Sequence, residues 1–257
     1  MTRILVFVYG LVVYVVFLAT FLYAIGFVGN VLVPQSVDLG GPVSDPIEAL
    51  CINAAMLGLF AVQHSGMARQ SFKRWLTSFI PPAAERSTFV LTASLLLIVM
   101  YWQWRPITSV VWDVSSSTVG TLLQAVFWAG WLILLLSTFL INHFDLFGLL
   151  QVTRNLSGKP IEAPNFKAPA LYQFVRHPIY LGFLLSFWAT PKMTLGHLLF
   201  SVATTGYILV GIYFEERDLV RMFGDTYRDY MRQVPMLIPL PGRSYHEGQR
   251  STHASGA

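Results

Sequence analysis

The feature that most constrains the fold is a run near the start of the chain, residues 4–33, that contains no charged side chain. A helix of about 20 apolar residues crosses the hydrocarbon core of a bilayer, so this run can span a membrane with room for tilt. The run is far longer than the core of a signal peptide, and no small-residue cleavage site follows it. We therefore expect it to remain as the first transmembrane helix.

The composition extends this conclusion to the whole chain. Of its 257 residues, 54% are hydrophobic and only 12% are charged, whereas soluble domains carry about 25% charged residues. Too few charges are present to cover a water-exposed surface. We predict an all-α integral membrane protein with about five to six transmembrane helices. The further apolar runs are residues 47–63, 87–104, 119–141, 179–190 and 194–214.

The same pattern divides the chain into three parts. Residues 1–150 hold four predicted spans, and residues 151–242 hold a polar loop, a helical hairpin and a charged amphipathic helix over 215–233. Residues 243–257 are rich in Gly, Ser, His and Arg, and we expect them to be disordered. The single cysteine, Cys51, lies in an apolar run and gives no disulfide framework.

The basic residues predict the orientation of the spans. With the N-terminus inside, fifteen of the seventeen Lys and Arg residues lie on the inner side, and only Arg105 and Lys192 lie outside. The positive-inside rule then places both termini and the long polar loops in the cytoplasm. The net charge of +4 reflects this bias, so membrane lipid is an expected partner and nucleic acid is not.

The most informative segment is residues 176–182, RHPIYLG. It places Arg and His at the mouth of a short helix that begins with Pro. A second segment begins with Glu215 and Glu216, which close the last long span, and continues with FG at 223–224, YRDY at 227–230 and VP at 234–235. A carboxylate at that depth is costly unless it meets a cation, so these glutamates predict a cationic partner. The alternative is that they only cap a helix.

These two segments together resemble the isoprenylcysteine and phospholipid methyltransferases over roughly residues 165–241. Those are integral membrane enzymes that use S-adenosylmethionine. The resemblance implies that residues 151–242 form the core that binds S-adenosylmethionine. The N-terminal half is similar to NnrU-like membrane proteins, through QHSGMAR at 63–69 and ERS at 85–87.

The resemblance also implies a set of cofactor-binding residues. Glu215 matches the carboxylate that receives the ammonium group of S-adenosylmethionine, and this agrees with the need of an interfacial carboxylate for a cation. The full set is Gln151, Asn165, Phe166, Tyr172, Arg176, His177, Pro178, Tyr180, Glu215 and Glu216.

One departure from the family narrows the methyl acceptor. The isoprenylcysteine enzymes place an arginine one turn before that glutamate, to hold the carboxylate of the substrate, and Gly211 stands there in this chain. The arrangement is similar to bacterial membrane enzymes that methylate a small thiol. It implies methanethiol as the acceptor, dimethyl sulfide as the product and the bacterial cytoplasmic membrane as the location.

A thiol acceptor requires a base nearby. The pKa of a cysteine thiol is about 8.5, and the thiolate is the reactive form. Transfer also needs near-attack geometry and exclusion of water. If the fourth span continues far enough, two of the candidates, Asn142 and Asp145, share a helix face. The candidate catalytic residues at the required depth are His64, Asn142, His143 and Asp145.

Our hypothesis for these residues is that His143 or His64 accepts the proton of the thiol. Asp145 would orient a histidine, or would pair with Arg176 or Arg69. No metal is predicted, because the histidines are not spaced as ligands on one helix and there is no cysteine cluster.

Other functions remain open on the sequence alone. A membrane methyltransferase could act on a lipid amine or a prenylcysteine carboxylate. The NnrU-like N-terminal half is also compatible with a membrane redox or accessory protein of nitrogen oxide metabolism. The order of the C-terminal segments is also compatible with an NADPH-dependent membrane reductase. No obligate protein partner is inferred. His197, inside the last span, is expected to be a core residue that forms hydrogen bonds.

Overall fold

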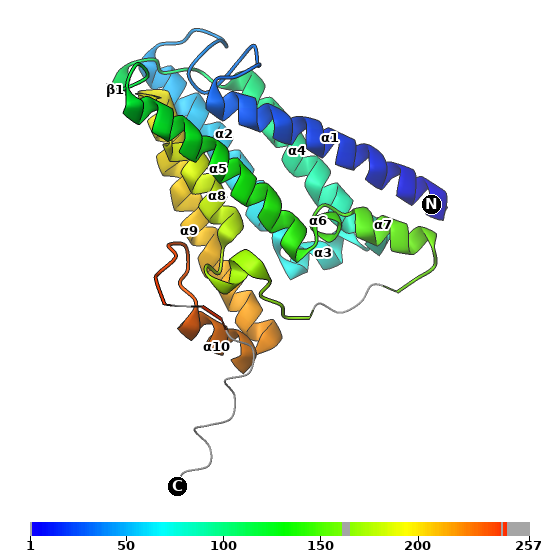
Figure 1. Cartoon of the computed structure of the whole chain (residues 1–257). Coiled ribbons are helices and arrows are strands. Elements are labelled where there is room, and N and C mark those ends of the chain that lie inside the picture. Colours follow the sequence, from blue (N-terminus) through cyan, green and yellow to red (C-terminus); the bar gives the residue numbers. More distant parts are fainter. Residues whose placement is uncertain (1, 161–164, 243, 246–257) are drawn as a thin grey trace.

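Five helices of the structure, a computed structural model, are long and apolar enough to cross a membrane (Figure 1). The structure describes residues 2–160, 165–242, 244 and 245. The predicted all-α, multi-pass architecture is confirmed. The five helices are α1 (Arg3–Gly29), α2 (Pro46–Ala68), α4 (Glu85–Gln103), α5 (Thr118–Ile141) and α9 (Leu195–Phe223).

Shorter elements connect these helices and include one small sheet. Strands β1 (Val110–Asp113) and β2 (Lys192–Thr194) pair in antiparallel register. They lie at the opposite end of the long helices from α10 (Figure 1). The short helices are α3 (Gln70–Leu76), η1 (Pro82–Ala84), α6 (His143–Leu146), α7 (Leu149–Leu156), η2 (Ala170–Gln173), α8 (Pro178–Trp188) and α10 (Asp225–Gln233).

Local sequence sets the starts of four spans. In each, a side-chain oxygen accepts a hydrogen bond from a backbone N–H of the first turn, which is the usual N-cap arrangement. The capping residues are Thr2 for α1, Asp45 for α2, Ser117 for α5 and Thr194 for α9.

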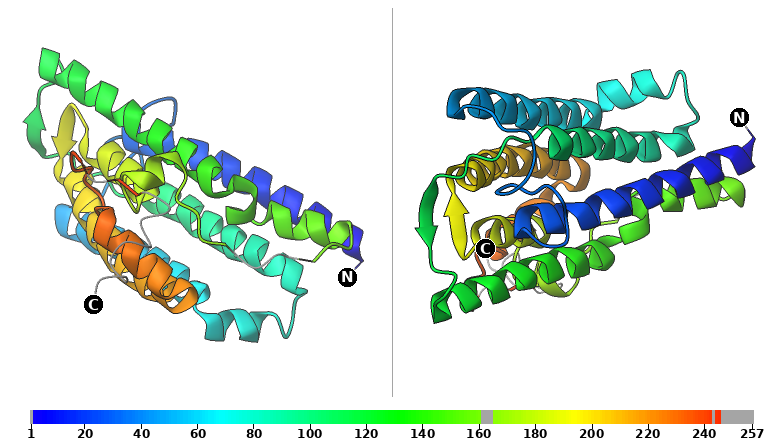
Figure 2. Two further views of the ribbon diagram at one scale, coloured as in Figure 1. Left: turned by 60° about the horizontal axis from the view of Figure 1, so that its bottom comes forward. Right: turned by 90° about the horizontal axis from the view of Figure 1, so that it is seen from above.

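Helix α8 packs directly on α5, and two glycines allow the contact (Figure 2). A Cβ at Gly130 would lie 2.7 Å from the carbonyl oxygen of Gly182, and a Cβ at Gly182 would lie 2.7 Å from the carbonyl oxygen of Gly130. Ser186, one turn after Gly182, donates from its hydroxyl to the carbonyl of Phe127 at 3.2 Å. Small residues at this spacing let helix backbones approach closely in membranes. The contact fixes the helix that follows the RHP segment.

The C-terminal helices differ from the prediction in one respect. The last span does not end at residue 214, because α9 continues to Phe223 and ends at Gly224, whose φ of +58° breaks the helix. Glu215 and Glu216 therefore lie inside α9. Most of residues 215–223 are good helix formers, namely Glu, Arg, Leu and Met, so the charge of this segment does not stop the helix. Helix α8 has 11 residues and a length of about 16 Å, so it does not cross a bilayer core of about 30 Å by itself.

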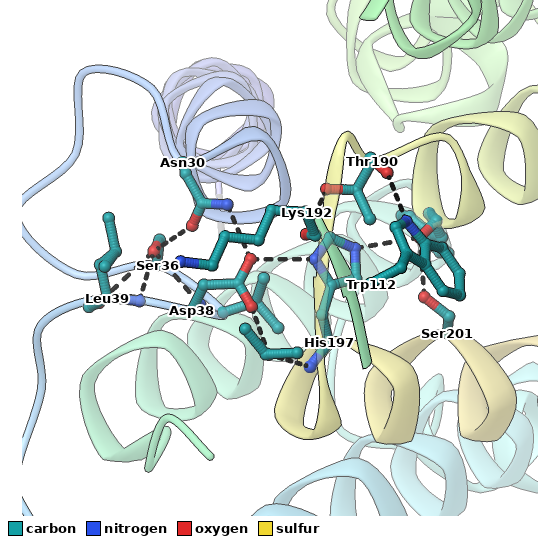
Figure 3. A network of polar contacts seen from close by, with 12 residues as sticks. Asn30, Ser36, Asp38, Leu39, Trp112, Thr190, Lys192, His197 and Ser201 are labelled. Carbon is teal, nitrogen blue, oxygen red and sulfur yellow. Dashed lines mark hydrogen bonds and ion pairs between the residues drawn. The ribbon is translucent and has the colours of Figure 1, made fainter. Parts of the chain in front are cut away.

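A buried polar network joins the loop after α1 to the start of α9 (Figure 3). Asp38, only 5% exposed, accepts from the Thr194 hydroxyl at 2.5 Å and from the Asn30 amide at 2.7 Å. Nδ1 of His197, which is fully buried, lies 3.0 Å from the Asp38 carboxylate. Nε2 of His197 lies 3.0 Å from the carbonyl of Phe187. The expectation that His197 is a hydrogen-bonded core residue is confirmed.

Hydrogen bonds and charge hold this network together. Both ring nitrogens of His197 face acceptor atoms, a carboxylate oxygen and a backbone carbonyl. Burial by itself would raise the pKa of Asp38, but the hydrogen bonds and charge of His197, with the hydrogen bonds of Thr194 and Asn30, hold that pKa below its usual value. An ionised Asp38 thus ties three segments together.

Removal of the Asp38 carboxylate is expected to be costly. Asp38→Ala leaves His197 buried without its partner, and we expect a loss of about 3–5 kcal/mol in stability. Because the folded pKa of Asp38 is lowered, its contribution is present above a pH of about 3.9 and is lost as the pH falls through the folded pKa. Thermal melting in detergent checks both expectations. The exposed Asp113→Asn is the control, and equal melting temperatures of Asp38→Ala and Asp113→Asn at neutral pH would contradict the account.

Candidate active site

The RHP segment and the segment after α10 are joined by their backbones. The N–H of Arg176 donates to the carbonyl of Pro235 at 3.0 Å, and the N–H of His177 donates to the carbonyl of Met236 at 3.2 Å. Pro178 is the first residue of α8, where its fixed φ suits the helix and its missing N–H costs nothing. The two sequence motifs therefore form one structural unit.

The Arg176 side chain completes this unit. Its Nε donates to Glu216 at 2.7 Å, and one terminal nitrogen donates to the carbonyls of Met231 at 3.1 Å and Val234 at 2.6 Å. A cation at the C-terminal end of α10 is favoured by the helix dipole. Nε2 of His177 lies 3.0 Å from the same Glu216 oxygen. Glu216 is thus already paired within the protein, and its side chain is only 14% exposed.

Glu215, the neighbouring carboxylate, is placed differently. Its side chain is 44% exposed, and the nearest contact with a basic side chain is the one to His177, at 3.8 Å. Within the described part of the chain, no lysine or arginine lies within 4.0 Å of it. Burial and the nearby Glu215 carboxylate raise the pKa of the Tyr180 hydroxyl. Burial, together with the nearby charge of Glu215, raises the pKa of Tyr172. Glu215 is therefore a half-exposed carboxylate beside two protonated tyrosines.

A second group of residues lies around His64. Its ring stacks on Phe60 at 5.2 Å and lies 4.7 Å from the Phe89 ring. The Tyr207 ring lies edge-on to it at 6.4 Å, and the Tyr207 hydroxyl is 3.4 Å from that of Ser65. Nδ1 of His64 is buried and has no hydrogen-bond partner among the described residues. A buried ring nitrogen of this kind is available to a ligand.

Tyr207 connects the two groups along α9. It lies near Tyr180, which in turn lies near Glu215. Tyr207, Gly211 and Glu215 are spaced four apart, so they share one face of α9. A Cβ at Gly211 would meet no atom within 4 Å, so this face is open between Tyr207 and Glu215. Sequence reasoning did not single out Tyr207, although its spacing from Glu215 was the available signal.

The structure places His143 apart from this face. Its Nδ1 lies 2.9 Å from the Thr138 hydroxyl, its Nε2 lies 2.8 Å from the Tyr14 hydroxyl, and its ring stacks on Phe139 at 4.3 Å. Burial lowers the pKa of His143, so the ring is neutral at pH 7. Both nitrogens already have partners.

Two of the arrangements that the sequence allowed for Asp145 are not found. Helix α5 ends at Ile141, and Asn142, with φ +149°, caps α6 by accepting from the N–H of Asp145. Asn142 and Asp145 therefore do not share a helix face. Asp145 also does not pair with Arg176 or Arg69. Its carboxylate accepts from Gln151 at 3.0 Å. Arg176 pairs with Glu216.

The remaining candidates lie near α10 or at its periphery. Phe166 packs edge-on against Phe223, Tyr227, Tyr230 and Tyr245. Asn165 is exposed. Apart from Ser244 and Tyr245, the tail predicted to be disordered lies outside the described residues. Within the described ranges, no three His, Cys, Asp or Glu side chains gather so that they could hold a metal ion.

This fold and site define a multi-pass membrane protein of the membrane methyltransferase class, in which the RHP segment and a glutamate pair meet at one end of the bundle. Comparison with known proteins agrees. The chain is 55% identical to a methanethiol S-methyltransferase of Mycobacterium tuberculosis, over 95% of this chain and 99% of that protein. It is 54% identical to methanethiol S-methyltransferase 1 of Bradyrhizobium diazoefficiens, over 92% of this chain and 83% of that protein.

The chain therefore belongs to the methanethiol S-methyltransferase family. A more distant match is nurim of mouse, 25% identical over 67% of this chain and 69% of that protein. No family model and no solved structure matches the chain. The resemblance to membrane methyltransferases is confirmed.

The two glutamates are expected to differ in their effect on stability. Glu216→Ala leaves the mostly buried Arg176 without its carboxylate, and we expect a loss of about 3–5 kcal/mol. Glu215→Ala removes a half-exposed side chain and should change stability by no more than about 0.5 kcal/mol. Thermal melting of both variants in detergent, without ligand, makes the comparison. A Glu215 variant that melts as low as the Glu216 variant would show that the assignment is reversed.

Proposed function

We propose that this protein transfers a methyl group from S-adenosylmethionine to methanethiol and releases dimethyl sulfide. The observation that carries the proposal is the state of Glu215, a half-exposed carboxylate with no lysine or arginine beside it among the described residues. It stands in the motif pair of the membrane methyltransferases. Methanethiol is proposed as the acceptor because the relatives are named methanethiol S-methyltransferases.

The residues present fit S-adenosylmethionine. Its ammonium group suits Glu215, because a charge-assisted hydrogen bond stabilises both groups. The hydroxyls of Tyr172 and Tyr180 lie beside that carboxylate. Buried Oε1 of Gln151 has no partner among the described residues and can accept from a ligand. Bound S-adenosylmethionine would supply an electrophilic methyl group, whose bond to the sulfonium sulfur breaks with the electron pair returning to that sulfur.

Other residues of the predicted set have a positioning role in this proposal. Arg176 and Glu216 hold the chain on either side of the site, and His177 bonds to both segments. Pro178 starts α8 at the correct angle. Phe166 packs against α10 and, with Asn165, lies on the side that we assign to the adenosine.

The base in this proposal is His64. Its Nδ1 is buried and unpartnered, so it can take the proton of the thiol as the sulfur forms its bond to the methyl carbon. His143 is less suited, because both of its nitrogens already meet hydroxyls. The rings of Phe60 and Phe89 beside His64 exclude water. Asp145 and Asn142 act through the fold, not on the acceptor.

We place the site on the cytoplasmic side of a bacterial inner membrane. Fifteen of the seventeen basic residues fall on the side that carries both termini, as the positive-inside rule requires. The methanethiol S-methyltransferases that the chain resembles are bacterial. At this position S-adenosylmethionine, which is polar, can enter the site from the cytoplasm. The apolar thiol can enter from the membrane lipid.

The role of Glu215 is tested by Glu215→Gln. The purified protein receives S-adenosylmethionine and methanethiol, and dimethyl sulfide is followed in the headspace by gas chromatography. We expect the wild type to form product and Glu215→Gln to lose at least about 10²-fold in rate. S-adenosylhomocysteine should raise the melting temperature of the wild type but not of the variant. Full stabilisation of Glu215→Gln by that ligand would contradict the role of the carboxylate.

The assignment of the base is tested by comparing two histidines. We expect His64→Gln to reduce kcat by about 10²- to 10⁴-fold. His143→Gln should keep most activity. Because burial lowers the pKa of His143, its titration moves away from neutral pH toward acid, so the pH profile on the alkaline side of neutral should not change in His143→Gln. A larger loss in His143→Gln than in His64→Gln, with both variants folded, would overturn the assignment.

A further inference from the structure

Arg86 carries a charge that no carboxylate balances at close range. It lies in the first turn of α4, where the positive end of the helix dipole disfavours a cation. Its Nε donates to the carbonyl of Leu146 at 2.8 Å, and its guanidinium lies 5.2 Å from the centre of the Phe89 ring. Among the described residues, no carboxylate lies within 4.0 Å, and Glu85 and Asp145 act on it only from farther away. A cation in this position is costly unless a ligand meets it.

Buried polar atoms without partners occur on residues linked to this arginine. Ser87 follows it in α4, and its hydroxyl lies 2.7 Å from where a Cβ of Gly148 would stand, just before α7. The Phe89 ring contacts both the Arg86 guanidinium and the His64 ring. Seven buried polar atoms have no partner in the described part of the chain, and four of them belong to residues linked to Arg86. Ser87 is its neighbour in α4, His64 shares the Phe89 ring with it, Gln63 precedes His64, and Gln151 binds Asp145. The four atoms are Oε1 of Gln63, Nδ1 of His64, Oγ of Ser87 and Oε1 of Gln151.

This arrangement suits a small anion with an apolar body. The guanidinium supplies the positive charge, and the His64 nitrogen supplies a place for a proton. The aromatic rings of Phe60 and Phe89 supply the polarizable contacts that sulfur favours.

We infer that Arg86 is a further catalytic residue, which stabilises the thiolate of the methyl acceptor. The inference rests on the proposed function and names the residue that activates the acceptor. The S–H bond breaks and the proton passes to Nδ1 of His64. The negative charge on sulfur is held by Arg86 until the sulfur electron pair forms the new bond to the methyl carbon. The charge on sulfur is then gone, so the neutral thioether no longer binds to the guanidinium.

Other titratable groups also face Arg86 and enter the pH dependence. Glu85 precedes it in α4, Asp145 lies on α6, and His64 lies on α2. Tyr9 on α1 hydrogen-bonds the Thr88 hydroxyl at 2.9 Å. His64 becomes a cation only when it takes the thiol proton, and Glu85, Asp145 and Tyr9 carry no positive charge that would replace Arg86 after substitution.

The test compares Arg86→Gln and Arg86→Lys with Arg74→Gln, an exposed arginine on α3 that serves as the matched control. Each variant is assayed with S-adenosylmethionine and two acceptors, methanethiol and the more acidic 2,2,2-trifluoroethanethiol. We expect Arg86→Gln to lose about 10²-fold in kcat/KM with methanethiol and clearly less with the acidic thiol. Its pH profile should move up by about 1 unit or more, because a nearby positive charge no longer favours the thiolate. Arg86→Lys should restore part of the rate, and Arg74→Gln should match the wild type.

Binding of S-adenosylhomocysteine separates this role from a loss of fold. We expect both Arg86 variants to be stabilised by it as the wild type is. Equal losses with the two thiols, an unshifted pH profile and no rescue by lysine would overturn the inference. If Arg86→Gln does not fold, the test is made with Arg86→Lys. An equal loss of kcat/KM with both thiols in Arg86→Lys, together with an unshifted pH profile, would also overturn the inference. A wild type that methylates a carboxylate but neither thiol would refute the thiolate role, and a wild type that methylates nothing would refute the proposed function itself.

Discussion

The contact on which the rest of the site depends is the one between Arg176 and Glu216. It joins α9, the RHP segment and the end of α10, because the same guanidinium also binds one backbone carbonyl in the last turn of α10 and one just after it. With His177 it satisfies Glu216 inside the protein. The neighbouring Glu215 forms no ion pair with an arginine or lysine of the described residues. One glutamate of the pair thus builds the site and the other is free for a ligand.

Much of the fold could be predicted because hydrophobic length decides it. The five long helices follow the apolar runs of the sequence. The predicted end of the last span at residue 214 was wrong, because helix propensity outweighs charge there. Helix α9 continues through its charged residues to Phe223 and is capped by Gly224. The two strands were missed because three or four residues give no periodic signal. The break at Asn142 was missed because it rests on local backbone geometry.

The candidate site could be predicted only in part. The residues of the two motifs are brought together as the sequence pattern indicated, because they are joined through backbone contacts that the motifs themselves supply. His64 and His143 could not be distinguished by sequence, since both lie at the same predicted depth. The difference lies in partners far along the chain, such as Tyr14, which bonds to His143. Arg86 was passed over because its lack of a carboxylate partner is visible only in three dimensions.

The central claim is that the methyl group passes from S-adenosylmethionine to methanethiol on this protein. The most direct measurement uses donor whose reactive methyl group carries three deuterium atoms, with unlabelled methanethiol and purified protein, and headspace mass spectrometry of the product. The account predicts dimethyl sulfide with one trideuterated and one ordinary methyl group, formed only when both substrates are present. The absence of labelled dimethyl sulfide, from folded protein that S-adenosylhomocysteine stabilises, would contradict it.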